Sequence, residues 1–306
     1  MVTINCVTVT VIVSSLFACC SNSILDFRVN LVIVYINIIY YNYIMNFEKI
    51  GFVLCNIVSE DKKTKDVNIY FATHKDKDKI KYPIESIELD DKNESMQHMP
   101  YTMKDEGNTR QILYVSGASG SGKSYYASSY IREYVKMFPK NDVFVVSSVD
   151  KDKQLDSIKN VQRIKLDEKF CDTGFSIDDF KDSMVVYDDT ETIANKMVQE
   201  KITNIMNLIL TTGRHINTFA INTSHATNGG HRTKLILLES HSVTLFLATM
   251  GDRALKYFLE TSFGLGKKQI DKIKELDSRW ITICRTIPVS VLHEKGIFIL
   301  NKKKKN

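Results

Sequence analysis

The segment "GASGSGKS", residues 117–124, constrains the fold more than any other part of the chain. It follows the apolar run "ILYVS" at 112–116 and precedes "YYASSYIREYVKMF" at 125–138, which has the composition of a helix. The segment matches G-x-x-x-x-G-K-[ST], a motif that joins a buried strand to a helix in phosphate-binding α/β proteins. The alternative, a Gly/Ser-rich turn that precedes a lysine by chance, carries little weight because the strand and the helix both lie where the motif needs them. The sequence therefore predicts a phosphate-binding loop.

The residue types in this loop suit ATP and Mg²⁺. Glycines let successive backbone N–H groups curl around a phosphate, and the helix N-terminus adds its positive dipole. Lys123 is placed to bridge the β- and γ-phosphates, and Ser124 is placed to offer its hydroxyl to Mg²⁺. The residues that we expect to bind the nucleotide are Gly117, Ser119, Gly120, Ser121, Gly122, Lys123, Ser124 and Tyr125.

From residue 111 onward, strand-like and helix-like segments alternate, which is typical of a mostly parallel sheet flanked by helices. Apolar residues at helical spacing predict one helix that ends before Pro139 and another that ends at Gly213. Two or three closing strands are expected after residue 278. The six earlier strands are expected at 112–116, 142–148, 161–166, 184–189, 219–224 and 243–248.

Composition shifts divide the chain further. The whole chain is 43% hydrophobic, enough for one large α/β core and a small additional module. Short β-type runs between Lys/Asp-rich turns predict a small β module, and a polar stretch after it is typical of a linker. The expected parts are an apolar leader at 1–44, a β module at 45–90, a linker at 91–110, the ATPase domain at 111–301 and a basic tail at 302–306.

The leader contains only one acidic residue, Asp26, and one basic residue, Arg28. It lacks the positive start of a secretory signal, and neither of its apolar stretches reaches the roughly 18 to 20 residues of a spanning helix. Charge density becomes ordinary at Met45, so our hypothesis is that 1–44 is upstream sequence translated from a misassigned start. A membrane anchor is the alternative. The six cysteines show neither zinc nor disulfide spacing, which suits a reducing, intracellular compartment.

The segment "MVVYDDTE", 184–191, is an apolar strand that ends in acids. Asp188 at its tip is placed to hold Mg²⁺, and Asp189 to orient or deprotonate an attacking water. Glu191 is the alternative base. A helix-capping turn is the purely structural interpretation of the two aspartates.

The segment "TTGRHINTFAINTSH", 211–225, predicts a strand followed by Ser224 and His225. His225 is a candidate sensor of the γ-phosphate, although a lone histidine is more often a surface residue. Arg214 is a candidate finger that reaches a neighbouring subunit's nucleotide in a ring, and a salt bridge is its structural alternative. Arg253 is a second candidate for the same role.

The blocks "GASGSGKSYYASSYI", "VFVVSSVDKDKQLD", "VVYDDTE", "GRHINTFAINTSH" and "FGLGKKQIDKIKELDSRW" occur in this order. Over roughly residues 111–300 they resemble the genome-packaging ATPases of poxviruses, giant DNA viruses and virophages, a branch of the FtsK/HerA superfamily. The phosphate-binding loop is shared by many families, so the "GRH…TSH" block carries most of the likeness. The resemblance assigns phosphate and Mg²⁺ contacts to Lys123 and Ser124, the acidic pair to Asp188 and Asp189, and the polar sensor to His225, where relatives often carry Gln. Asp rather than Glu after the first acid leaves the identity of the base open.

The resemblance implies a P-loop NTPase with an additional strand in its sheet, similar to RecA and FtsK. It implies a homo-oligomeric ring that hydrolyses ATP and pulls double-stranded DNA into a preformed capsid, working with a capsid or portal component. The host cytoplasm or a viral factory, or the virion itself, is the implied location. The net charge of +5 is compatible with a polyanionic partner without being diagnostic. Arg232 and Lys234, in the loop 225–234, are candidates for DNA contact, and a solvated loop is the preferred alternative.

Two other functions are compatible with the loop. A P-loop nucleotide kinase would carry a lid with arginines that clamp the acceptor, and no such cluster stands out in the sequence. A membrane-associated assembly or secretion ATPase, similar to the filamentous-phage morphogenesis proteins of the same superfamily, would need residues 1–44 as its anchor.

Overall fold

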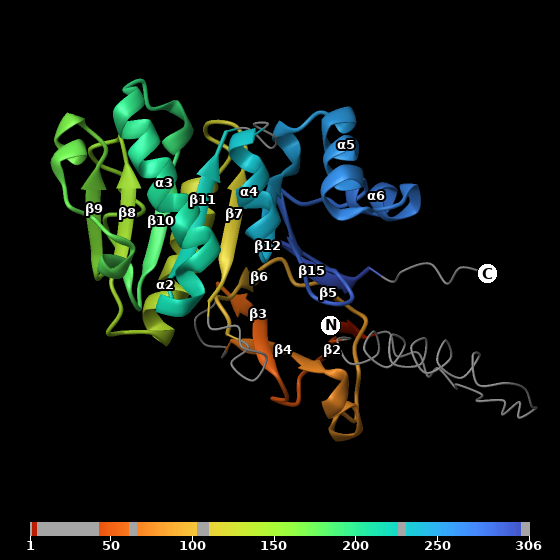
Figure 1. The fold of residues 1–306 in the computed structure, drawn as a ribbon. Helices are drawn as coiled ribbons and strands as arrows, with labels where there is room; N and C mark the ends of the chain where they lie inside the picture. The colour runs from red at the N-terminus through yellow and green to blue at the C-terminus, as the bar shows by residue number, and fades with distance from the viewer. Residues whose placement is uncertain (1, 5–42, 61–65, 103–109, 226–230, 301–306) are drawn as a thin grey trace, which may run out of the picture.

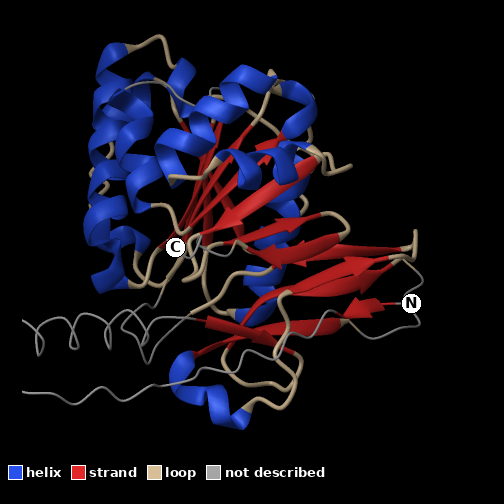
Figure 2. Cartoon of the chain, turned by 90° about the vertical axis from the view of Figure 1, so that its right-hand side faces the viewer, coloured by secondary structure: helices blue, strands red, loops and turns tan. Residues whose placement is uncertain are grey.

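The computed structural model describes residues 2–4, 43–60, 66–102, 110–225 and 231–300. A large sheet with helices on both faces packs against a smaller sheet (Figures 1 and 2). The predictions for most of the leader, for the loop 226–230, for the Arg232 side chain and for the basic tail lie outside the described residues. No described helix has the combination of length and apolar character that crossing a bilayer requires.

Six neighbouring strands of the large sheet run parallel in the order β12-β7-β11-β10-β8-β9. Helices cover both faces of these strands, which explains why most of them are continuous apolar runs rather than alternating patterns. Their bounds match the predicted strands closely. They are β7 (Ile112–Ser116), β8 (Val143–Ser147), β9 (Val161–Lys165), β10 (Met184–Asp188), β11 (Phe219–Ser224) and β12 (Ser242–Phe246).

Strand β11 lies between β7, which carries the phosphate-binding loop, and β10, which carries the acids. In the register, Thr223 of β11 is paired with Val115 of β7 and with Asp188 of β10. The three strands therefore end at the same edge of the sheet. This order confirms the predicted P-loop NTPase fold with an additional strand.

The sheet continues beyond β12 with antiparallel strands, as expected for the closing segment. Strand β15 then pairs with β5, which comes from the N-terminal part of the chain, and β5 pairs with β1. The bounds are β1 (Val2–Ile4), β5 (Ser86–Leu89), β13 (Trp280–Cys284), β14 (Ser290–His293) and β15 (Gly296–Ile299).

The helices divide between the two faces of the large sheet. Helix α2 and the small sheet share one buried cluster, and the other helices share a second cluster on the opposite face. Both predicted helices are confirmed, the second with Asn195 accepting hydrogen bonds from the N–H groups of Met197 and Val198 and with Gly213 as its C-cap. The helices are α2 (Lys123–Met137), α3 (Lys196–Thr212), α4 (His231–Glu239), α5 (Asp252–Phe263) and α6 (Lys267–Lys274). The 3₁₀ helices are η1 (His74–Lys79), η3 (Glu168–Asp172), η4 (Ile177–Phe180), η5 (Thr190–Thr192), η6 (Gly213–Ile216) and η7 (Leu247–Thr249).

The small antiparallel sheet has the order β2-β4-β3-β6. The structure differs here from the sequence-based division in two places. The range predicted as a linker contains β6, whose alternating Met96 and His98 are buried although the segment is polar overall. The segment from 86 to 89, predicted as part of the β module, instead pairs with β15 in the large sheet. The bounds are β2 (Tyr43–Asn46), β3 (Phe52–Ser59), β4 (Val67–Thr73) and β6 (Glu94–His98).

Candidate functional site

The phosphate-binding loop folds as a cradle at the carboxyl end of β7. Gly120 and Gly122 adopt φ angles of 75° and 108°, which residues other than glycine rarely adopt. A Cβ at Gly117 would lie 3.0 Å from the Phe246 ring, and one at Gly122 would lie 3.3 Å from it. Helix α2 starts directly behind the loop at Lys123, so its N-terminal N–H groups face the cradle. The loop thus has the shape that a phosphate group needs.

Lys123, His225 and Asp189 form a polar chain across this edge of the sheet. The Lys123 Nζ donates hydrogen bonds to the carbonyl oxygens of Gly117 and Ala118, at 2.9 and 3.3 Å, and lies 3.4 Å from His225 Nδ1. The Nε2 atom of His225 lies 2.9 Å from Asp189 Oδ2. An ammonium group has only donors, so His225 Nδ1 is the acceptor and Nε2 carries the proton that is donated to Asp189. The histidine therefore links the lysine to the acid.

Asp188 is the buried member of the acidic pair, with only 8% of its surface exposed. Its carboxylate accepts hydrogen bonds from Thr223 Oγ1 at 3.0 Å and from Ser147 Oγ at 3.2 Å, from the strands on either side. Burial raises the pKa of this carboxyl. A nearby cation would offset the cost of burying the charge, so the position fits a Mg²⁺ site of the kind that combines one protein carboxylate with substrate phosphates.

Asp189 differs from Asp188 in its backbone. Its φ angle is 47°, in the left-handed region that Asp and Asn tolerate better than most residues. Its N–H donates to Thr223 Oγ1 at 3.2 Å. This turn directs the carboxylate toward His225 and away from the partners of Asp188.

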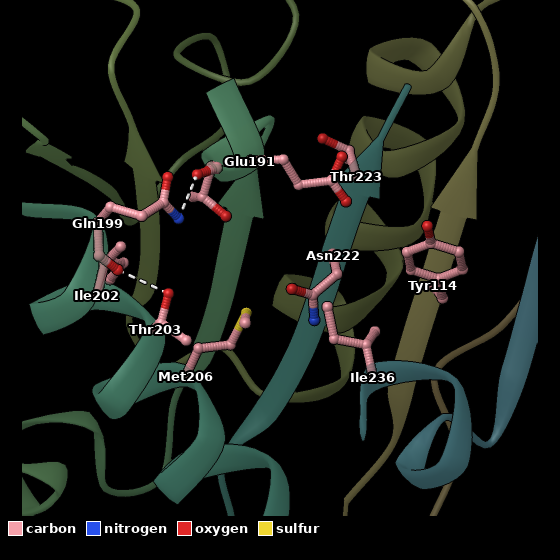
Figure 3. A pocket seen from close by; sticks show the side chains of 10 residues that line it. Tyr114, Glu191, Gln199, Ile202, Thr203, Met206, Asn222, Thr223 and Ile236 are labelled. Atoms are coloured by element: carbon pink, nitrogen blue, oxygen red, sulfur yellow. Dashed lines mark hydrogen bonds between the residues drawn. The ribbon is translucent and has the colours of Figure 1, made fainter. Parts of the chain in front are cut away.

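Glu191 lies on a different side of the sheet edge. Its Oε1 accepts a hydrogen bond of 2.6 Å from Ser224 Oγ, and its side chain lines a cavity of about 30 Å³ between α3, α4 and β11. Figure 3 shows the carboxylate reaching from η5 toward β11, above Asn222 and Tyr114. The structure therefore links Asp189 to Lys123 through His225 and gives Glu191 a separate partner.

The two candidate arginines lie at opposite edges of the sheet. Arg214 is exposed in η6, before β11 begins, so a strand about 20 Å long separates it from the site of its own chain. Arg253 is exposed in the first turn of α5, on the same edge as the loop. The segment that leads into α5 contacts the loop directly, because the Thr249 hydroxyl accepts a hydrogen bond of 3.4 Å from the N–H of Ala118.

The remaining residues predicted to bind the nucleotide lie in the loop itself and in the first turn of α2. Ser119 is exposed at the tip of the loop, and Ser124 is half-buried in the first turn of α2. The Ser121 N–H donates to the Ala118 carbonyl at 3.2 Å, and the Tyr125 side chain is 65% exposed. Lys234, proposed for DNA contact, is exposed on α4.

Sequence reasoning missed three residues that shape the site: Ser147, Thr223 and Phe246. The first two are hydroxyl residues at the carboxyl ends of buried strands, which is a visible signal once those strands are known to be neighbours of β10. Phe246 carries no signal, because an aromatic residue at the end of an apolar strand looks like ordinary core.

No protein-family model matches the chain. Over 189 residues, the chain is 43% identical to the uncharacterized protein V3 of the Sputnik virophage, a match that covers 61% of this chain and 76% of the relative. The chain belongs to the family of this virophage protein. The predicted resemblance is confirmed in two respects: the relative is a virophage protein, and the fold is that of a P-loop NTPase.

Solved structures with similar folds share much less sequence. The genome packaging NTPase B204 of Sulfolobus turreted icosahedral virus 2, in complex with AMPPCP, is 14% identical, with a TM-score of 0.42 over 60% of this chain and 98% of that chain. The pCW3 conjugation coupling protein TcpA is 12% identical, with a TM-score of 0.44 over 60% of each chain. The cytoplasmic domain of the Thermomonospora curvata type VII secretion ATPase EccC is 12% identical, with a TM-score of 0.43 over 72% of this chain and 30% of that chain.

Proposed function

We propose that the protein hydrolyses ATP at the edge formed by β7, β11 and β10. The observation that carries this proposal is the connection from Lys123 through His225 to Asp189. It joins a residue that contacts the terminal phosphates in P-loop enzymes to an acid that can act on water.

The proposed mechanism relies on positioning and charge. The loop N–H groups bind the β-phosphate, and Lys123 leaves its loop carbonyls to contact the γ-phosphate. Asp189 orients the attacking water and takes its proton. His225 holds the Asp189 carboxylate in place and couples it to the position of Lys123.

Ser124 and Asp188 would hold Mg²⁺, which neutralises developing charge on the phosphates when it is bound. Asp188 suits this role because its burial leaves the carboxylate charge poorly solvated, and because Ser147 and Thr223 fix both of its oxygens.

We further propose that hydrolysis drives double-stranded DNA into a viral capsid. Two observations support this step: the "TSH" end of the "GRH…TSH" block falls on the end of β11 and on His225, within the site, and the chain belongs to a virophage family. The working unit would be a homo-oligomeric ring that acts with a capsid or portal component in the host cytoplasm or viral factory. Arg253 on the loop edge is then better placed than Arg214 to act near a nucleotide at a subunit boundary.

The experiment is steady-state ATP hydrolysis by the full chain, with and without long duplex DNA, and with Lys123→Ala as the blank. ATP turnover that duplex DNA stimulates and that Lys123→Ala abolishes is the expected result. If duplex DNA does not change the rate of ATP turnover, the proposal of DNA translocation is contradicted and the proposal of ATP hydrolysis stands. Phosphate transferred to a nucleoside monophosphate rather than to water would indicate a kinase instead.

A further inference from the structure

A second cavity, of about 490 Å³, opens beside the phosphate-binding loop. This volume is within the range of small-molecule sites. It lies between β6 of the small sheet, the start of α2 and the turn that joins β14 to β15. Its lining includes Ser121 and Gly122, so it is continuous with the cradle.

The position of the cavity matches the direction in which a nucleotide would extend. The acids and His225 lie on one flank of β7, at the ends of β10 and β11. The cavity lies on the other flank, where Phe246 ends β12 and Trp280 begins β13. A nucleotide whose γ-phosphate meets Lys123 and Asp189 has its α-phosphate and ribose on the far side of the loop, which is the side of this cavity.

The wall formed by the large sheet and α2 is aromatic. The Tyr126 ring contacts Trp280 edge-on at 4.9 Å between centroids, and Phe246 at 6.5 Å. Tyr125, in the first turn of α2, also lines the cavity, and its side chain is 65% exposed. An exposed aromatic ring beside a buried aromatic cluster offers a surface on which a planar base can stack.

The other walls are polar and rigidly held. Glu294 accepts hydrogen bonds of 2.7 Å each from the Arg279 Nε and from the Arg279 N–H, which fixes the guanidinium at the rim. Lys295 Nζ donates to the carbonyl of Glu94 at 2.6 Å, and the Met96 N–H donates to the carbonyl of Glu294 at 2.8 Å. These contacts fasten β6 to the hairpin of β14 and β15, so the small sheet is a fixed wall of the cavity.

A buried hydrogen-bond chain joins this wall to the helix that carries the loop. His98 Nδ1 of β6 lies 3.0 Å from the Tyr126 hydroxyl, which lies 2.6 Å from Thr282 Oγ1. Three of the elements that line the cavity, β6, α2 and β13, are therefore held together by directional contacts, and the cavity exists before any ligand binds.

We propose that this cavity receives the base and ribose of the nucleotide, with the Tyr125 ring stacking on the base and β6 of the N-terminal sheet forming the opposite wall. The inference rests on the proposed function, because the phosphates must first occupy the cradle. It gives the N-terminal small sheet a role in nucleotide binding.

The test compares the binding of ATP and of inorganic tripolyphosphate, both with Mg²⁺, to the full chain by calorimetry. Tripolyphosphate occupies only the cradle, so contacts of the base and ribose affect ATP alone. We expect Tyr125→Ala to weaken ATP binding by roughly 5- to 100-fold, the range for losing one aromatic stacking partner, and to leave tripolyphosphate binding within about twofold. Tyr125→Phe should bind ATP like the native protein. Tyr257→Ala, at another exposed helical tyrosine, is the matched control.

A second variant tests the wall formed by the small sheet. Ser95→Trp adds a bulky ring at a lining residue of β6 and should weaken ATP but not tripolyphosphate, whereas Ser95→Ala should change neither. The inference is overturned if both Tyr125→Ala and Ser95→Trp bind ATP like the native protein, or if they weaken both ligands equally. Native protein that binds neither ATP nor tripolyphosphate would overturn the proposed function, and this inference with it.

Discussion

The Nε2 atom of His225 lies 2.9 Å from Oδ2 of Asp189, and the other ring nitrogen of the histidine faces Lys123. A residue at the end of β11 thus connects the acid at the end of β10 to the lysine that follows β7. The connection exists because β11 is inserted between the other two strands. The phosphate-binding loop and the acidic pair are therefore joined through one side chain.

Replacing His225 with Ala should lower kcat by about 100-fold, because Asp189 loses the partner that fixes its carboxylate. His225→Gln should keep most of the activity, since a carboxamide has an acceptor for Lys123 and a donor for Asp189. The measurement is kcat and KM for ATP, with His215→Ala, at the opposite edge of the sheet, as the control. A Gln variant no better than the Ala variant would contradict the proposed role.

Asp189→Asn should leave ATP binding largely intact and reduce turnover by roughly 10²- to 10⁴-fold, the usual contribution of a general base. Asn tolerates the left-handed backbone of this position, so the turn after β10 should persist. Glu191→Gln should retain activity, because its amide oxygen can still accept from Ser224. Binding and single-turnover hydrolysis separate the two effects. The assignment of the base is reversed if Glu191→Gln is inactive while Asp189→Asn turns over.

Asp188→Asn should abolish Mg²⁺-dependent hydrolysis without lowering thermal stability. Burial raises the pKa of the Asp188 carboxyl, so its ionised form is disfavoured by the fold, and a neutral amide of the same shape removes this cost. The measurements are hydrolysis across a Mg²⁺ titration and the Tm without nucleotide. A lower Tm would show that the hydrogen bonds from Ser147 and Thr223 to the charged carboxylate outweigh its burial.

Stability should rise with pH between about 4 and 6.5. Burial lowers the pKa of His98 to about 3 and that of His241 to about 4, so both stay neutral in the fold while they bind protons in the unfolded chain. The unfolded state therefore holds more protons in this window, and each histidine contributes a slope of up to about 1.4 kcal/mol per pH unit that vanishes above pH 6.5. The raised pKa of Asp188 has the opposite effect at the acidic end of this range, because the folded state then binds more protons than the unfolded chain and stability falls as the pH rises.

Urea unfolding between pH 5 and 7.5 measures this slope. His98→Gln keeps an acceptor for Tyr126 and should reduce the slope by about 1.4 kcal/mol per pH unit near pH 5. The same slope in the variant and in the native protein would show that His98 is protonated in the folded state.

Much of the ATPase domain could be predicted from the sequence, because its signals are local. The apolar run 112–116, the glycines at 120 and 122 and the helical spacing after Lys123 define the strand, the loop and the helix without any distant contact. The acids that end the strand 184–188 were found for the same reason. A buried parallel strand must be apolar along its length, so a charged residue at its tip is conspicuous.

The predicted β-type runs of the N-terminal module became β3 and β4, but one further strand and one pairing were missed because they depend on distant partners. Strand β6 has a polar sequence, and only its pairing with β3 and the burial of Met96 and His98 make it a strand. Strand β5 lies next to the small sheet in sequence but pairs with β15, about 200 residues later. Which strands pair depends on which sheet edges are available in the assembled fold. The local sequence pattern of a strand carries no information about this.

The sequence by itself determined the phosphate-binding loop, the acidic pair and the order of strands and helices along the chain. Only the tertiary structure decided that His225 connects Lys123 to Asp189, that Glu191 belongs with Ser224, and that Arg214 lies far from the loop. It also created the cavity between β6, α2 and β13. The physical reason is the same in each case: spacing along the chain fixes backbone conformation and burial, whereas contacts between strand ends follow from the order of strands in the sheet, which is set by the packing of the whole core.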